Sequence, residues 1–159
     1  MNKPALLQAI IARIGEELEV YAKAAEASRA EATHESSKAE NKYDTRGLEA
    51  SYLARGQSRQ IAELEAAVIA FQALAPRTFA ADEPIDVGAY VELEQKGERD
   101  AYFIGPKAGG TELEFKGQEV LVITPQSPLG AQLVGRKQGD LLKLTLPGSR
   151  AQYRVAKVV

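Results

Sequence analysis

Two patterns of hydrophobic residues divide the chain into two halves. In the first half, hydrophobic residues recur at alternating steps of four and three, a spacing that keeps one narrow stripe facing a partner helix. The stripe consists of Leu7, Ile11, Ile14, Leu18, Tyr21, Ala25, Ser28 and Ala32. The same steps return at Ile61, Leu64, Val68 and Phe71. We therefore expect an antiparallel coiled-coil hairpin of two helices over residues 1–75.

Both stripes are bulky at the base of the expected hairpin and thin toward its tip. In the first arm, leucine and isoleucine give way to alanine and serine after Tyr21. In the second arm, counting back from Ile61 by the same steps reaches Gln57, Ala54 and Ala50. A dimerisation rod would keep large residues along its length, so the taper favours a slim intramolecular hairpin and a monomeric protein.

The polar stretch Thr33–Tyr52 lies between the two arms and contains the tip of the hairpin, near residues 33–47. Acidic residues alternate here with basic ones, and His34 is the only histidine of the chain. Such charges are either the solvated end of a hairpin or a surface that reaches into a partner.

After residue 84 the hydrophobic period changes to two, which is typical of strands. Six segments carry this period: 89–94, 100–105, 111–115, 119–124, 141–146 and 151–159. Ser127–Gly135 has a helical pattern, with Ser127 as N-cap and Pro128 at the first helical position. Residues 76–84 form the expected linker. We thus predict an α+β protein in which residues 85–159 form a small antiparallel sheet domain with one short helix.

The net charge, the cysteine content and the length of the apolar runs exclude several classes of function. The net charge of −2 gives no general affinity for nucleic acid, and the absence of cysteine excludes disulfides and thiolate metal sites. No apolar run approaches the length of a membrane span, so we expect a cytoplasmic protein without a membrane partner. The second half has no histidine, so its serines lack a general base that could activate them as nucleophiles. We therefore expect no enzyme activity of the chain's own.

The order of these parts resembles the GreA/GreB family of bacterial transcript cleavage factors. The residues that carry the resemblance are Ser127-Pro128-Leu129-Gly130, Leu133–Gly135, Gly139-Asp140, Pro147-Gly148 and Tyr153–Val155, with Glu40-Asn41 and Tyr43 in the tip. The resemblance implies an FKBP-like fold for the second half. It also implies that the hairpin enters the secondary channel of RNA polymerase while the globular domain docks on its rim, at Gln126, Ser127 and Pro128 of this chain.

In the family, two tip acids in an Asp-x-x-Glu-Asn pattern help to hold a Mg²⁺ ion shared with the polymerase, and the polymerase then cleaves backtracked RNA. Hard oxygen ligands suit Mg²⁺, and the chain itself would bring no cofactor. Here Glu40 and Asn41 keep the second half of the pattern, but Ser37 replaces the first acid. The resemblance leaves Glu35 or Asp44 as the second ligand beside Glu40.

The resemblance implies a factor that binds bacterial RNA polymerase, inserts its tip through the secondary channel and meets RNA or DNA only within that complex. Cleavage of backtracked RNA is one activity of such a factor. A regulator of initiation or pausing that occupies the channel without cleavage is the alternative. A coiled-coil interaction rod unrelated to transcription is a third interpretation.

Overall fold

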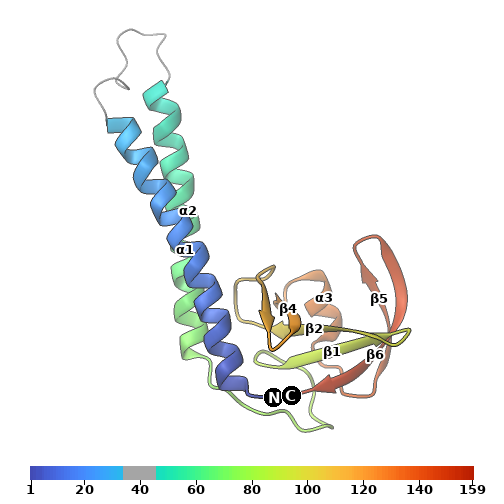
Figure 1. Ribbon diagram of the computed structural model, residues 1–159. Coiled ribbons are helices and arrows are strands. Elements are labelled where there is room, and N and C mark those ends of the chain that lie inside the picture. Colours follow the sequence, from blue (N-terminus) through green and yellow to red (C-terminus); the bar gives the residue numbers. More distant parts are fainter. Residues whose placement is uncertain (34–45) are drawn as a thin grey trace. The chain divides into compact units, whose positions relative to one another are not determined.

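The computed structural model describes residues 1–33 and 46–159, and their side chains outside residues 32–55 (Figure 1). Two long helices, α1 (Lys3–Thr33) and α2 (Arg46–Ala73), come first. The remaining elements are β1 (Tyr90–Gln95), β2 (Glu98–Ile104), β3 (Glu112–Phe115), β4 (Gln118–Ile123), α3 (Pro128–Leu133), β5 (Leu141–Leu146) and β6 (Ser149–Val158). The predicted helices and all six predicted strands are present, which confirms the α+β class.

By its internal contacts the chain divides into two compact units. One unit comprises Met1–Arg13 and Ile69–Val159, and the other comprises Ile14–Val68. The first unit contains the whole sheet, the start of α1 and the end of α2, and the second contains the rest of the two helices and the segment between them. The predicted domain boundaries, a hairpin over 1–75, a linker over 76–84 and a globular domain over 85–159, stay a prediction.

Helix α1 begins where its sequence places the start signals. The side-chain oxygen of Asn2 accepts a hydrogen bond from the backbone N–H of Ala5 at 3.0 Å, which satisfies one of the first-turn donors. Pro4 lies in the first turn, where its missing N–H has no partner to lose. Asparagine and proline together therefore define the start of the hairpin.

The predicted stripe of α1 is buried at Leu7, Ile14, Ala25 and Ser28. Tyr21, however, is 38% exposed, so its assignment to the stripe is wrong. The next stripe residue toward the tip is Ala25, whose methyl group is too small to cover a phenol ring. In α2, Leu64 and Phe71 are buried as predicted, and the Arg29 guanidinium donates to the Ser58 hydroxyl at 3.1 Å.

The sheet has the strand order β3-β4-β2-β1-β6-β5. Neighbouring strands pair in antiparallel fashion except β2 and β4, which run parallel with Ala101 opposite Val120. The purely antiparallel sheet predicted from the sequence is therefore wrong at this one pair. The β3–β4 hairpin reverses the chain before β4 joins β2, so the two strands point in the same direction.

Two of the hairpins use tight turns with glycine in the second position. Lys96 and Gly97 between β1 and β2, like Lys116 and Gly117 between β3 and β4, all have positive φ values, from 51° to 81°. Two successive positive φ values define the type I′ turn, whose twist matches that of the flanking strands. These turns fix the register of both hairpins.

Nonpolar side chains from the same unit cover part of each face of the sheet. On one face, Leu129 and Leu133 of α3 join a buried cluster with residues such as Ile104 and Leu144. On the other, the ring of Phe71 from α2 contacts Phe103, with ring centroids 6.1 Å apart. Gly105 is required beside this ring, because a Cβ there would lie 2.6 Å from a Phe71 ring carbon. The base of α2 is thus part of the core of the sheet.

Candidate functional site

The predicted tip site lies outside the residues that the structure describes. This holds for the proposed assisting acids and metal ligands, Glu35, Glu40 and Asp44, and for the supporting residues Ser37, Asn41 and Tyr43. The acids, the metal and the supporting residues therefore stay predictions.

The predicted docking residues Gln126, Ser127 and Pro128 form one turn that leads into α3. The Ser127 hydroxyl donates to the Thr124 carbonyl oxygen at 2.7 Å and accepts from the Gly130 N–H at 3.1 Å. Ser127 has extended backbone angles, φ −68° and ψ 154°, as an N-cap residue should. One side chain therefore closes the turn and caps the helix, which confirms its predicted N-cap role.

Gly130 allows this turn to be so tight. A Cβ at this position would lie 1.8 Å from the Thr124 carbonyl oxygen, a distance that no side chain tolerates. The Ser-Pro-Leu-Gly sequence is therefore a folding unit in which serine caps, proline starts the helix and glycine permits the close approach.

The turn presents two of its three predicted residues to solvent. Gln126 and Pro128 are exposed and Ser127 is half-buried, whereas Leu129 points into the core. The helix ends at Leu133, two residues earlier than predicted, because the residue after it, Val134, leaves the helical conformation with ψ 131°. The resulting surface is a short rigid turn with one amide and one pyrrolidine ring.

Hydrogen bonds to distant segments hold α3 in place. The side-chain amide of Gln132 donates to the Thr145 carbonyl oxygen at 3.2 Å and accepts from the Thr145 N–H at 3.0 Å. After the helix, the Gly135 N–H donates to the Ile85 carbonyl oxygen at 2.9 Å. The Ile85 N–H donates to the Arg136 carbonyl oxygen at 2.7 Å. These bonds fix the position of α3 and of the turn before it.

Sequence reasoning did not identify the buried Lys3. This side chain is 4% exposed, and its ammonium donates to the carbonyl oxygens of Arg77, at 2.9 Å, and of Gly88. It also lies 4.9 Å from the centre of the Phe79 ring. Burial, with the positive charge of Arg77 as the second cause, lowers its pKa to about 8. A lone lysine near an N-terminus gives no sequence signal for burial.

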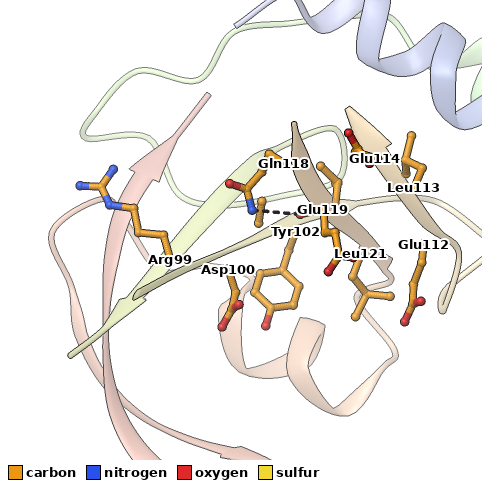
Figure 2. Close-up of a pocket in the computed structure, with 11 residues that line it drawn as sticks. Arg99, Asp100, Tyr102, Glu112, Leu113, Glu114, Gln118, Glu119 and Leu121 are labelled. Atoms are coloured by element: carbon orange, nitrogen blue, oxygen red, sulfur yellow. Dashed lines mark hydrogen bonds between the residues drawn. The ribbon is translucent and has the colours of Figure 1, made fainter. Parts of the chain in front are cut away.

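A second feature that the sequence reasoning missed is a hollow of about 570 Å³ over β2, β3 and β4. Figure 2 shows Asp100, Glu112 and Glu119 around it, with Tyr102 and Leu121 between them. The signal was present in the alternating acids of Thr111–Phe115. The hollow itself could be recognised only from the pairing of β2, β3 and β4.

Residues 1–33 and 46–159 contain no group of three or more acidic, histidine or cysteine side chains arranged to hold a metal ion. The helices in these ranges are also too short or too polar to cross a membrane.

Comparison with known proteins gives one family match. Residues 80–159, which include the whole sheet and α3, match the family model described as transcription elongation factor, GreA/GreB, C-terminal domain. The matched part is half of the chain, and it contains the turn of Gln126, Ser127 and Pro128.

Two individual relatives match a longer part of the chain. The transcription elongation factor GreA of Acidiphilium cryptum is 33% identical over 101 residues, which are 62% of this chain and 60% of the relative. The match therefore spans less than two thirds of that relative's length. The transcription inhibitor protein Gfh1 of Thermus thermophilus is 30% identical over 122 residues, 73% of this chain and 72% of the relative.

Solved structures of Gfh1 are also similar to the chain. One is 26% identical, covers 94% of this chain and 93% of its own, and has a TM-score of 0.42. A crystal structure of Gfh1 from Thermus thermophilus is 24% identical and covers 95% of both chains, with a TM-score of 0.40.

Proposed function

Because the chain belongs to the GreA/GreB family of transcription elongation factors, we propose that it binds bacterial RNA polymerase and reaches into the secondary channel with the tip of its hairpin. The observation that carries the proposal is the family match over the sheet domain, together with the ordered turn within it. The chain would act as a monomer in the cytoplasm, would contact RNA or DNA only within the complex, and would supply no catalytic centre of its own.

The docking step uses the turn before α3. Pro128 has a fixed φ, and Ser127 is held by two hydrogen bonds, so the turn loses little conformational entropy on binding. Gln126 adds an exposed amide that can donate and accept hydrogen bonds. We therefore assign most of the affinity for polymerase to this turn, and the positioning of the tip to the hairpin.

The first candidate activity is stimulation of RNA cleavage. Glu40 with Glu35 or Asp44 offers the carboxylate oxygens that Mg²⁺ prefers, and Asn41 with Tyr43 would support the loop. A Mg²⁺ ion shared with the polymerase would activate the attacking water and stabilise the leaving oxygen.

The second candidate is a channel-binding regulator without cleavage activity, and two observations favour it. Ser37 stands where the family pattern has its first acid, and a hydroxyl cannot replace the charge of a carboxylate. One relative that matches 73% of the chain bears the name transcription inhibitor. Membership of the family favours both candidates over an interaction rod unrelated to transcription.

Docking is tested by titrating labelled RNA polymerase with the Gln126→Ala and Pro128→Ala double variant, which leaves the Ser127 cap intact. We expect at least about tenfold weaker binding, since both exposed groups of the turn are removed. The matched control is Gln152→Ala with Pro147→Ala, which removes the same residue types from β6 and the β5–β6 turn. Equal binding by the docking variant and the wild type would reject this surface.

Cleavage is tested on backtracked complexes assembled with purified polymerase. If the tip acids work, Glu40→Gln abolishes cleavage without changing the affinity for polymerase. If the activity was lost with the acid at position 37, the wild type cleaves little and Ser37→Asp raises cleavage. Strong wild-type cleavage that survives replacement of Glu35, Glu40 and Asp44 together would reject the tip mechanism.

A further inference from the structure

One face of the sheet changes character along β2 and β4. At their carboxyl ends, Ile104 and Ile123 belong to the buried cluster beneath α3. At their amino ends, Asp100 and Glu119 are exposed on the same face, because side chains two residues apart in a strand point the same way. The hollow of about 570 Å³ lies over this uncovered, acidic end.

Strand pairing brings the acids together in a row. Glu114 of β3 is opposite Glu119 of β4. Ala101 of β2 is paired with Val120 of the parallel strand β4. Asp100 and Glu119 directly precede these two residues, so they also lie side by side. Glu112 lies opposite Leu121 in the next row. We call the hollow with Asp100, Glu112, Glu114, Glu119 and Tyr102 the acidic groove.

Two basic side chains border the acidic groove. The Arg13 guanidinium of α1 donates to the backbone carbonyl oxygen of Glu112 at 3.2 Å. Arg99 forms ion pairs with Glu92 at 3.1 Å and Glu94 at 3.4 Å. Figure 2 shows its side chain directed away from the groove. No ion pair joins a basic side chain of the described residues to the four groove acids. Like charges in neighbouring strands oppose sheet stability, so this arrangement has a cost for the free protein.

Tyr102 lines the acidic groove and is 8% exposed. Its ring belongs to the buried cluster, yet its hydroxyl forms no hydrogen bond with any residue that the structure describes. Figure 2 shows this ring beside Asp100. Burial and the charge of Asp100 raise the pKa of Tyr102 to about 12, so its hydroxyl keeps its proton. The hydroxyl is not among the buried polar atoms of the described residues, so it is open to solvent at the groove although the side chain as a whole is almost buried. An accessible hydroxyl without a protein partner, next to carboxylates that form no ion pair, suits a ligand with a hydrogen-bonding cationic group.

The chemistry of the acidic groove excludes several ligand classes. Nucleic acids and phosphorylated ligands would be repelled by four carboxylates. The acids also do not converge as a metal site within the described residues. A cationic side chain fits better, because it neutralises the row without requiring the acids to move together.

We propose that the acidic groove binds an arginine-bearing segment of a protein partner, as an interaction surface separate from the tip and from the docking turn. A guanidinium is planar and carries five donors, so it can bridge two neighbouring carboxylates and also donate to the Tyr102 hydroxyl. A lysine ammonium reaches fewer of these acceptors at once and is more strongly hydrated. The groove therefore selects arginine over lysine.

The test uses the full chain and a tetra-arginine peptide with blocked ends, followed by amide chemical shifts in NMR. We expect the largest shift changes in β2, β3 and β4, and binding that weakens as salt is added. Asp100→Asn with Glu119→Gln should weaken binding about tenfold, because the row loses two of its charges. A tetra-lysine peptide of the same length should bind more weakly than the arginine peptide.

The matched control is Glu65→Gln with Asp82→Asn, which removes the same net charge from exposed sites outside the groove. This control should bind the arginine peptide as the wild type does. Tyr102→Phe should lower the affinity for the arginine peptide about threefold while leaving the lysine peptide unaffected. Equal losses in the groove and control variants, or no shift changes at about 1 mM peptide, would overturn the proposal. Neither peptide experiment contains polymerase, so its failure leaves the proposed function standing.

Discussion

The two compact units bury side chains of very different size. The unit of Met1–Arg13 and Ile69–Val159 buries aromatic and branched residues such as Phe71, Phe103 and Ile104. In the described part of the unit Ile14–Val68, the buried residues include Ala25, Ser28 and Ala67 beside Ile14 and Leu64. Hydrophobic stabilisation grows with the apolar area buried, so the sheet unit is held by its core. The described part of the hairpin unit buries smaller side chains, so it depends more on helix propensity.

The largest loss of stability is expected for Phe71→Ala, which tests whether the core of the sheet unit includes the end of α2. Its ring is 1% exposed and contacts Phe103, so its loss should lower the free energy of unfolding by about 3–5 kcal/mol. Ile69→Ala, at a side chain that is 66% exposed on the same helix, is the control and should change stability by less than about 0.5 kcal/mol. Urea denaturation followed by circular dichroism measures both. Similar losses in the two variants would contradict a core that extends onto α2.

The second prediction concerns the pH dependence that Lys3 gives to the sheet unit. Its pKa is about 8 in the folded protein, against an ordinary value of 10.5. Between these values the unfolded chain holds more protons, so the contribution of Lys3 to stability rises with pH. From pH 7 to pH 9.5, the stability of the wild type relative to Lys3→Met should increase by about 2 kcal/mol. A constant difference between the two proteins would show that the amine is not desolvated.

The third prediction tests the ordered turn. Ser127→Ala removes the cap of α3 and should lower the free energy of unfolding by about 1 kcal/mol. Ser127→Asp keeps a capping oxygen and should recover most of the loss. Ser149→Ala, at an exposed site that starts β6, serves as the control in the same denaturation assay. If Ser127→Asp is as unstable as Ser127→Ala, the hydroxyl does not act as a cap.

The smallest effect is expected in the hairpin unit, where Gly56→Ala should stabilise the protein by about 0.5–1 kcal/mol. A Cβ at Gly56 meets nothing within 4 Å, so only the gain in helix propensity remains. Gly15→Ala in α1 has the same open surroundings and should behave alike. Hydrogen exchange of hairpin amides measures the gain. Destabilisation by either substitution would mean that the glycine serves a contact or a bend.

The elements of both units could be predicted because their signals are local. The period of the hydrophobic residues predicted each helix and strand, and Ser127 with Pro128 carried enough cap chemistry to predict the start of α3. The docking role of this turn came from the family resemblance and stays a prediction. The parallel pairing of β2 and β4 could not be predicted, since pairing depends on contacts between segments distant in the sequence. The acidic groove depends on that same pairing and was missed with it.

Burial of polar side chains was the other failure of sequence reasoning. A lysine is normally exposed, and only the carbonyl oxygens of Arg77 and Gly88 with the nearby aromatic rings make a buried Lys3 acceptable. These partners come from a segment more than 70 residues away in the sequence. Tyr21 was misplaced for the opposite reason, because the spacing of the stripe says nothing of how well small neighbours cover a large ring.

The bidentate contact of Gln132 with Thr145 also affects how the protein behaves among its own copies. Strand β5 is the last strand of the sheet, and the outer backbone groups of such a strand are a template for edge-to-edge aggregation. The carboxamide of Gln132 occupies the N–H and the carbonyl oxygen of Thr145 as a neighbouring peptide group would. A single side chain thereby occupies the carboxyl-terminal end of this template, where it opposes the pairing of a second copy.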